Sequence, residues 1–108
     1  MTKIWFLLMM AIVLEVAGTT SMKFSAGFTR LLPSVLIFVF YAASFALLTL
    51  VLRKVDISIA YAIWSGLGTV LITAVGILWF KEPATALKLI CIGLIILGVV
   101  GLNLGKTA

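Results

Sequence analysis

Long apolar stretches separated by short polar segments make up almost the whole chain. A helix that spans a membrane needs about 20 predominantly apolar residues, and four stretches reach that length. They cover roughly residues 4–21, 31–52, 58–80 and 85–105. The pattern therefore predicts an all-α integral membrane protein, with a single four-helix transmembrane domain over residues 1–108.

The composition agrees with lipid as the solvent of these helices. Of the 108 residues, 65% are hydrophobic and 10% are charged, and a soluble domain of this size could not bury so much apolar surface. The single cysteine, Cys91, cannot form an intramolecular disulfide, and without any histidine we expect neither a metal site nor a cofactor. The sequence also lacks a nucleophile–base pair, so we do not expect an enzyme.

Basic residues are divided equally between the two sides of the membrane that four spans would define. One side would carry Lys3, Arg53, Lys54 and Lys106. The other side would carry Lys23, Arg30, Lys81 and Lys88. Because orientation follows the side with more Lys and Arg in short loops, this balance favours dual topology, in which oppositely inserted copies pair as an antiparallel homodimer. Chance in a small count is the alternative. The net charge of +5 is too dispersed to indicate nucleic-acid binding.

Glu15 is the one acidic residue within the long apolar stretches. A charged side chain at membrane depth is costly, so it faces the protein interior or a water-filled cavity and is a candidate functional group. Helical spacing places Ala11, Gly18 and Thr19 on the same face, where Gly18 and Thr19 would leave space beside the carboxyl group. A structural hydrogen bond within plain helix packing is the weaker alternative.

Aromatic residues in the second and third predicted helices suggest what the carboxylate binds. Trp64 lies some two turns inside its helix, too deep for an interfacial belt, which favours a position facing a cavity. Aromatic faces attract cations, a carboxylate supplies the countercharge, and apolar walls accept a lipophilic body. The pattern predicts a site for a hydrophobic organic cation, at which a proton would compete for the same carboxylate.

Glycines mark two further features of the predicted helices. Gly66 and Gly68 lie in the middle of the third helix, where glycine gives close packing or a kink that would act as a hinge. One face of the fourth helix carries small residues that let a partner helix approach. We expect a dimer interface formed by Leu94, Gly98, Gly101 and Gly105.

Four segments of the chain resemble signatures of the small multidrug resistance family, and together they cover essentially its full length. They are Glu15-Val16-Ala17-Gly18-Thr19-Thr20-Ser21-Met22-Lys23, Gly27-Phe28-Thr29-Arg30-Leu31 with Pro33-Ser34, Ala60-Tyr61-Ala62-Ile63-Trp64-Ser65-Gly66, and Gly98-Val99 with Asn103. The resemblance implies a multi-pass antiporter of the bacterial inner membrane, which works as an antiparallel homodimer and exchanges protons for organic cations.

The resemblance also implies roles for individual residues. Glu15 would bind proton and substrate, and the fourth helix would provide the dimer contact. The substrate pocket would include the neighbours of Glu15 together with Tyr41, Phe45, Tyr61, Trp64 and Ser65.

Two branches of the family differ beside the glutamate. The guanidinium-exporting branch typically has Trp-Ala where this chain has Gly18-Thr19, so the chain resembles the multidrug branch, which exports quaternary ammonium compounds. Lys81-Glu82-Pro83, by contrast, is similar to the guanidinium branch. A guanidinium/proton antiporter, a heterodimer with a paralogue and a non-transporting membrane assembly subunit are the alternatives.

Overall fold

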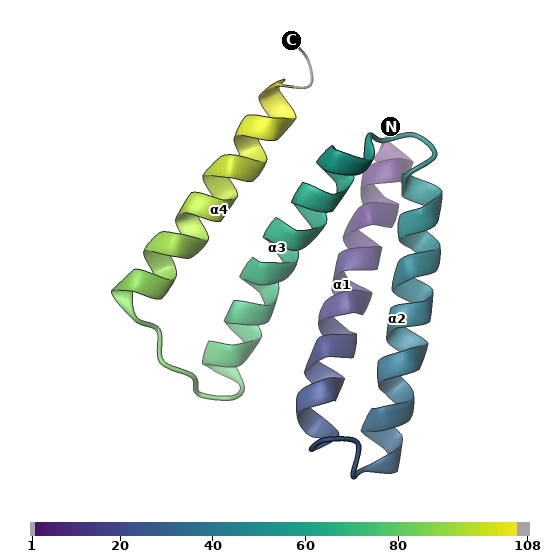
Figure 1. Cartoon of the computed structure of the whole chain (residues 1–108), viewed down its shortest axis with the longest axis vertical. Coiled ribbons are helices and arrows are strands. Elements are labelled where there is room, and N and C mark those ends of the chain that lie inside the picture. The colour runs from purple at the N-terminus through teal and green to yellow at the C-terminus, as the bar shows by residue number, and fades with distance from the viewer. Residues whose placement is uncertain (1, 106–108) are drawn as a thin grey trace. The chain divides into compact units, whose positions relative to one another are not determined.

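The structure is a computed structural model that describes residues 2–105. It contains four α-helices, and no strand occurs within those residues. The helices are α1 (Thr2–Phe24), α2 (Leu31–Val51), α3 (Ile57–Leu78) and α4 (Ala86–Gly105) (Figure 1). All four are long and apolar enough to cross a membrane. The predicted all-α, four-helix architecture is confirmed, and each helix lies within three residues of its predicted limits.

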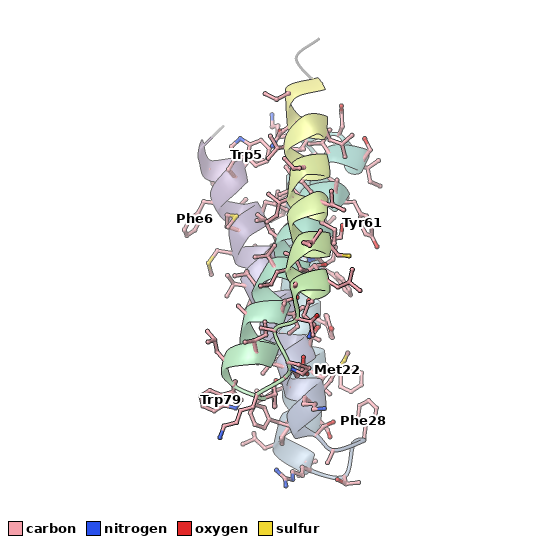
Figure 2. All side chains as sticks on the ribbon, turned by 90° about the vertical axis from the view of Figure 1, so that its left-hand side faces the viewer. Trp5, Phe6, Met22, Phe28, Tyr61 and Trp79 are labelled. Carbon is pink, nitrogen blue, oxygen red and sulfur yellow. The ribbon has the colours of Figure 1, made fainter. Side chains whose placement is uncertain are left out.

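The outside of the described chain is rich in large apolar side chains. Phe6, Phe28, Tyr61 and Trp79 are all mostly exposed, and Figure 2 shows them projecting from the ribbon. Soluble monomers rarely expose contiguous apolar patches larger than a few hundred Å². This distribution is that of a protein whose helices face lipid.

The chain divides into two compact units, Met1–Val55 and Asp56–Ala108. In the first unit, α1 and α2 lie side by side and antiparallel (Figure 1). Leu8, Ile12 and Ser44 are fully buried. The Ser44 hydroxyl on α2 donates a hydrogen bond of 2.7 Å to the carbonyl oxygen of Ala11 on α1, so a polar contact also joins the two helices.

The connection between α1 and α2 is organised around Ser25, which is almost fully buried. The Ser25 hydroxyl donates to the carbonyl oxygen of Met22 and accepts from the backbone N–H of Phe28. The Ser25 carbonyl oxygen accepts from the N–H of Thr29 at 2.9 Å. Gly27, with φ of +73°, takes a left-handed conformation that costs glycine little. These bonds hold the turn in one conformation and so contribute to the direction in which α2 leaves it.

In the second unit, α3 and α4 approach each other closely at Gly66. A Cβ atom placed on Gly66 would lie 2.5 Å from Cγ2 of Val99 and 3.5 Å from Cγ2 of Ile95, both on α4. The helix α3 continues without interruption through Gly66 and Gly68. Close packing, one of the two roles expected for glycine here, is therefore observed at Gly66, and the hinge role of the pair stays a prediction.

Three of the predicted dimer-interface residues, Leu94, Gly98 and Gly101, lie on an open face of α4. Leu94 is 61% exposed, and no atom lies within 4 Å of a Cβ placed on Gly98 or Gly101. Gly105 is the last residue of α4. The open face leaves room for a partner helix, and the dimer contact stays a prediction.

Loss of the buried Ser44 hydroxyl should destabilise the protein. We expect Ser44→Ala to lower the free energy of unfolding in detergent micelles by about 1–2 kcal/mol, because the hydrogen bond to Ala11 is lost. Thr49→Ala is the matched control on the same helix, since the Thr49 hydroxyl is exposed and donates to Phe45 within α2. Its effect should stay within about 0.5 kcal/mol. Equal effects of the two variants in a denaturant titration would contradict the stabilising role of Ser44.

Candidate functional site

Glu15 lies in the middle of α1 and is half-buried. Thr19, one helical turn later, donates its hydroxyl proton to Oε2 of Glu15 over 3.1 Å. Within residues 2–105, this is the one hydrogen bond that the carboxyl group makes. The other oxygen, Oε1, has no hydrogen-bond partner among those residues.

Tyr41 of α2 extends this contact to the neighbouring helix. Its hydroxyl oxygen lies 2.6 Å from Oγ1 of Thr19. Thr19 has a single hydroxyl proton, so when an ionised Glu15 carboxylate accepts that proton, Tyr41 is the donor in this second bond. A hydrogen-bonded chain thus runs from Tyr41 through Thr19 to Glu15. The sequence predicted all three as site residues but gave no sign that they are linked.

The space that Gly18 leaves is filled by Tyr41. A Cβ on Gly18 would lie 3.3 Å from Cε2 of the Tyr41 ring and 3.4 Å from Cβ of Phe40. The expectation of open space at Gly18 is therefore wrong within this unit. The glycine instead allows the tyrosine ring close enough to α1 for its hydroxyl to reach Thr19.

Phe45 on α2 and Ala11 on α1 are two further residues of the first unit that the sequence predicts for the pocket. The Phe45 ring, half exposed, stacks on Tyr41 with ring centroids 5.7 Å apart. Ala11 is fully buried, and its carbonyl oxygen accepts the bond from Ser44. The two hydrogen-bonded contacts with α2 thus lie one turn before and one turn after Glu15. Helical spacing places Ser44 on the same stripe of α2 as Tyr41 and Phe45, but the sequence does not single it out as a site residue.

Tyr61, Trp64 and Ser65 form a second cluster, on α3. Trp64 is 9% exposed and Tyr61 is 63% exposed, and their rings meet edge to face with centroids 6.0 Å apart. The Ser65 hydroxyl donates to the Tyr61 carbonyl oxygen within the helix. The cluster belongs to the second unit, and its participation with Glu15 in one pocket stays a prediction.

The Small Multidrug Resistance protein family model matches residues 3–95, which include Glu15 and the cluster on α3. The chain belongs to the small multidrug resistance family. Transporters of this family span the membrane with four helices and are not enzymes. The protein is therefore a multi-pass drug-efflux transporter of the bacterial inner membrane.

Individual relatives in the small multidrug resistance family are similar over nearly the full length. The uncharacterized membrane protein YvaE of Bacillus subtilis (strain 168) is 58% identical over 93% of this chain and 84% of its own length. The quaternary ammonium compound-resistance protein QacE of Escherichia coli is 45% identical, with coverage of 93% and 91%. The multidrug resistance protein EbrA of Bacillus subtilis is 43% identical, with coverage of 92% and 94%.

Proposed function

We propose that the protein is a proton-coupled antiporter that exports hydrophobic and aromatic organic cations, such as quaternary ammonium compounds. The observation that carries this proposal is the half-buried carboxyl group of Glu15, which has a neutral donor on Oε2 and a second oxygen to offer. A carboxylate at membrane depth is costly unless it has a ligand or partner. A proton or an organic cation can each supply the missing positive charge.

Competition between these two ligands accounts for the coupling. A carboxylate that holds a proton has no charge with which to bind a cation, so proton entry on one side releases the cation there. If the transporter reorients only when a proton or a cation is bound, the entry of protons drives the export of cations. Aromatic rings at the site stabilise the cation by cation–π attraction, which is strongest where water is excluded.

Tyr41 and Phe45 provide such a surface beside Glu15. Their stacked rings form an aromatic pair on α2, and Tyr41 reaches the carboxyl group through Thr19. We infer that Tyr61, Trp64 and Ser65 line the same pocket, together with Ala11, Gly18 and Thr19.

Quaternary ammonium and aromatic cations are the proposed substrates, in preference to guanidinium. QacE is named for resistance to quaternary ammonium compounds, and relatives from Escherichia coli and Salmonella typhimurium are putative ethidium bromide resistance proteins. A carboxylate flanked by aromatic rings suits such lipophilic cations, whereas guanidinium needs several hydrogen-bond acceptors.

Vesicle transport separates the two substrate classes. In proteoliposomes that contain this protein alone, a pH gradient should drive tetraphenylphosphonium uptake at least about tenfold faster than guanidinium uptake, which corresponds to about 1.4 kcal/mol of discrimination. Protein-free liposomes with the same gradient give the background. Faster guanidinium uptake would assign the guanidinium branch, and uptake of neither cation would support a non-transporting assembly subunit.

The proposed functional unit is an antiparallel homodimer of oppositely inserted copies. The equal distribution of basic residues supports it, as does the open face of α4. A reporter fused to the C-terminus should be found on both sides of the membrane in comparable amounts. Replacing Arg53 and Lys54 with alanine should shift most copies to one orientation, with the C-terminus outside, because the other side then has more basic residues. A wild-type reporter confined to one side would contradict dual topology.

A further inference from the structure

The Thr19 hydroxyl makes a different contact from those of its neighbours. Thr20 and Ser21 donate to the backbone carbonyl oxygens of Val16 and Ala17, one turn earlier in the same helix, which is the usual bond of a hydroxyl within a helix. Thr19 has the same opportunity but bonds to the Glu15 carboxyl group and to the Tyr41 hydroxyl. Its hydroxyl is therefore placed between a group that can gain a proton and a group on another helix.

We propose that the Thr19–Tyr41 pair reports the protonation state of Glu15 to α2 by reversing the direction of its hydrogen bonds. This inference rests on the proposed binding of a proton by Glu15. Thr19 and Tyr41 are positioning residues in it, because their hydroxyl groups act through Glu15, apart from any contact of the Tyr41 ring with the cation.

The two directions follow from counting protons. An ionised carboxylate only accepts, so Thr19 donates to Oε2 and Tyr41 donates to Oγ1 of Thr19. A protonated carboxyl group can donate to Oγ1 of Thr19, and Thr19 then turns its proton to the Tyr41 oxygen. The Tyr41 proton is released toward Sδ of Met22, which lies 3.9 Å from the Tyr41 oxygen and is a weak acceptor. The O–H bond of the Glu15 carboxyl group is the one covalent bond that forms or breaks in this change.

Glu15 is the charged group of the first unit that contacts the hydroxyl pair. Arg30, Arg53 and Lys54 lie outside the helices, in the segments that flank α2. On α1 the titratable side chains within the described residues are Lys3, Glu15 and Lys23, and on α2 the one such group is Tyr41. Both lysines lie near the ends of α1, two turns or more from Glu15. Within this helix pair, the proton on Glu15 is therefore the charge change that the hydroxyl pair can sense.

The consequence differs for the two proposed ligands of Glu15. A bound cation leaves the carboxylate ionised, so Tyr41 remains a donor to Thr19 and α2 stays tied to α1 by a charge-assisted chain, which is stronger than a neutral one. A bound proton turns Tyr41 into an acceptor, and among the described residues the sulfur atom of Met22 is then what its own proton can reach. The link between α1 and α2 is then weaker with a proton bound than with a cation bound.

Tyrosine Raman spectroscopy can test the reversal, because the intensity ratio of the ring's Fermi doublet distinguishes a donating phenol from an accepting one. The chain contains two tyrosines, so Tyr61→Phe leaves Tyr41 as the reporter. Infrared absorption of the Glu15 carboxyl group shows its protonation in the same samples. We expect the Tyr41 doublet to change from the donor to the acceptor pattern as Glu15 gains its proton.

Thr19→Val should remove the response of Tyr41 while the Glu15 band still changes, and Thr19→Ser should restore it. Thr20→Val is the matched control, since the Thr20 hydroxyl bonds to the Val16 carbonyl oxygen within α1, and it should respond as the Tyr61→Phe protein does. The inference would be overturned if the Tyr41 doublet of the Tyr61→Phe protein stayed constant while Glu15 gained its proton. It would also be overturned if the doublet still changed after Thr19→Val was added.

Transport measured on the unmodified protein, which keeps the proposed pocket residue Tyr61, separates this inference from the proposed function. A constant doublet in protein that transports would refute the reversal and leave the antiport intact. A doublet that reverses in protein that does not transport would refute the antiport and leave the reversal intact.

Discussion

Glu15→Gln is expected to abolish cation uptake driven by a pH gradient in proteoliposomes. Glutamine has the size of glutamate, and its amide oxygen can still accept the bond from Thr19. It can neither take up a proton nor supply a negative charge to a cation. Removing one charge of a buried pair typically costs 2–5 kcal/mol. Binding of tetraphenylphosphonium should therefore weaken by at least about 30-fold.

Glu82→Gln is the matched control for this experiment, because Glu82 is the other glutamate of the chain. It is exposed in the connection between α3 and α4, where its backbone N–H donates to the Gly76 carbonyl oxygen and its carboxyl group lies against Gly76. We expect this variant to transport at close to the parent rate. Gradient-driven uptake by Glu15→Gln at the parent rate would refute the proposed role of Glu15. Loss of uptake in Glu82→Gln would show that the assay responds to any lost carboxylate.

The four helices and Glu15 could be predicted from the sequence because both follow from the cost of polar groups in lipid. Backbone groups in a membrane must bond within their own segment, so a stretch of about 20 apolar residues has few alternatives to a helix. The same cost makes a carboxyl group in such a stretch conspicuous. These arguments need no knowledge of how the helices pack.

The contacts of the site could not be predicted in the same way, because they depend on how α2 is rotated against α1. The turn around Ser25 contributes to that rotation through hydrogen bonds of its hydroxyl and carbonyl groups. Helical spacing places Thr19 beside Glu15 on one helix, but it says nothing of Tyr41, 22 residues further along the chain. For the same reason we expected open space at Gly18, where the ring of Tyr41 packs.

Gly66→Ala should destabilise the packing of α3 on α4. The added Cβ would lie 2.5 Å from Cγ2 of Val99, and a valine side chain in a helix has one strongly preferred rotamer, so the methyl group cannot simply turn away. Overpacking of this kind costs about 1–3 kcal/mol. Alanine also favours the helix over glycine by about 1 kcal/mol, and this gain must be subtracted before the packing term can be measured.

Gly93→Ala supplies that correction, since no atom lies within 4 Å of a Cβ placed on Gly93. In a denaturant titration in micelles, we expect Gly66→Ala to be less stable than Gly93→Ala by about 1–3 kcal/mol. Val99→Ala should rescue the defect, because the nearest remaining atom of residue 99 is then its Cβ at 3.7 Å, an ordinary contact. The double variant should therefore be more stable than the sum of the two single changes predicts, by at least about 0.5 kcal/mol. Strictly additive effects would show that Gly66 and Val99 do not pack against each other, and the requirement for glycine would then have to come from the proposed hinge.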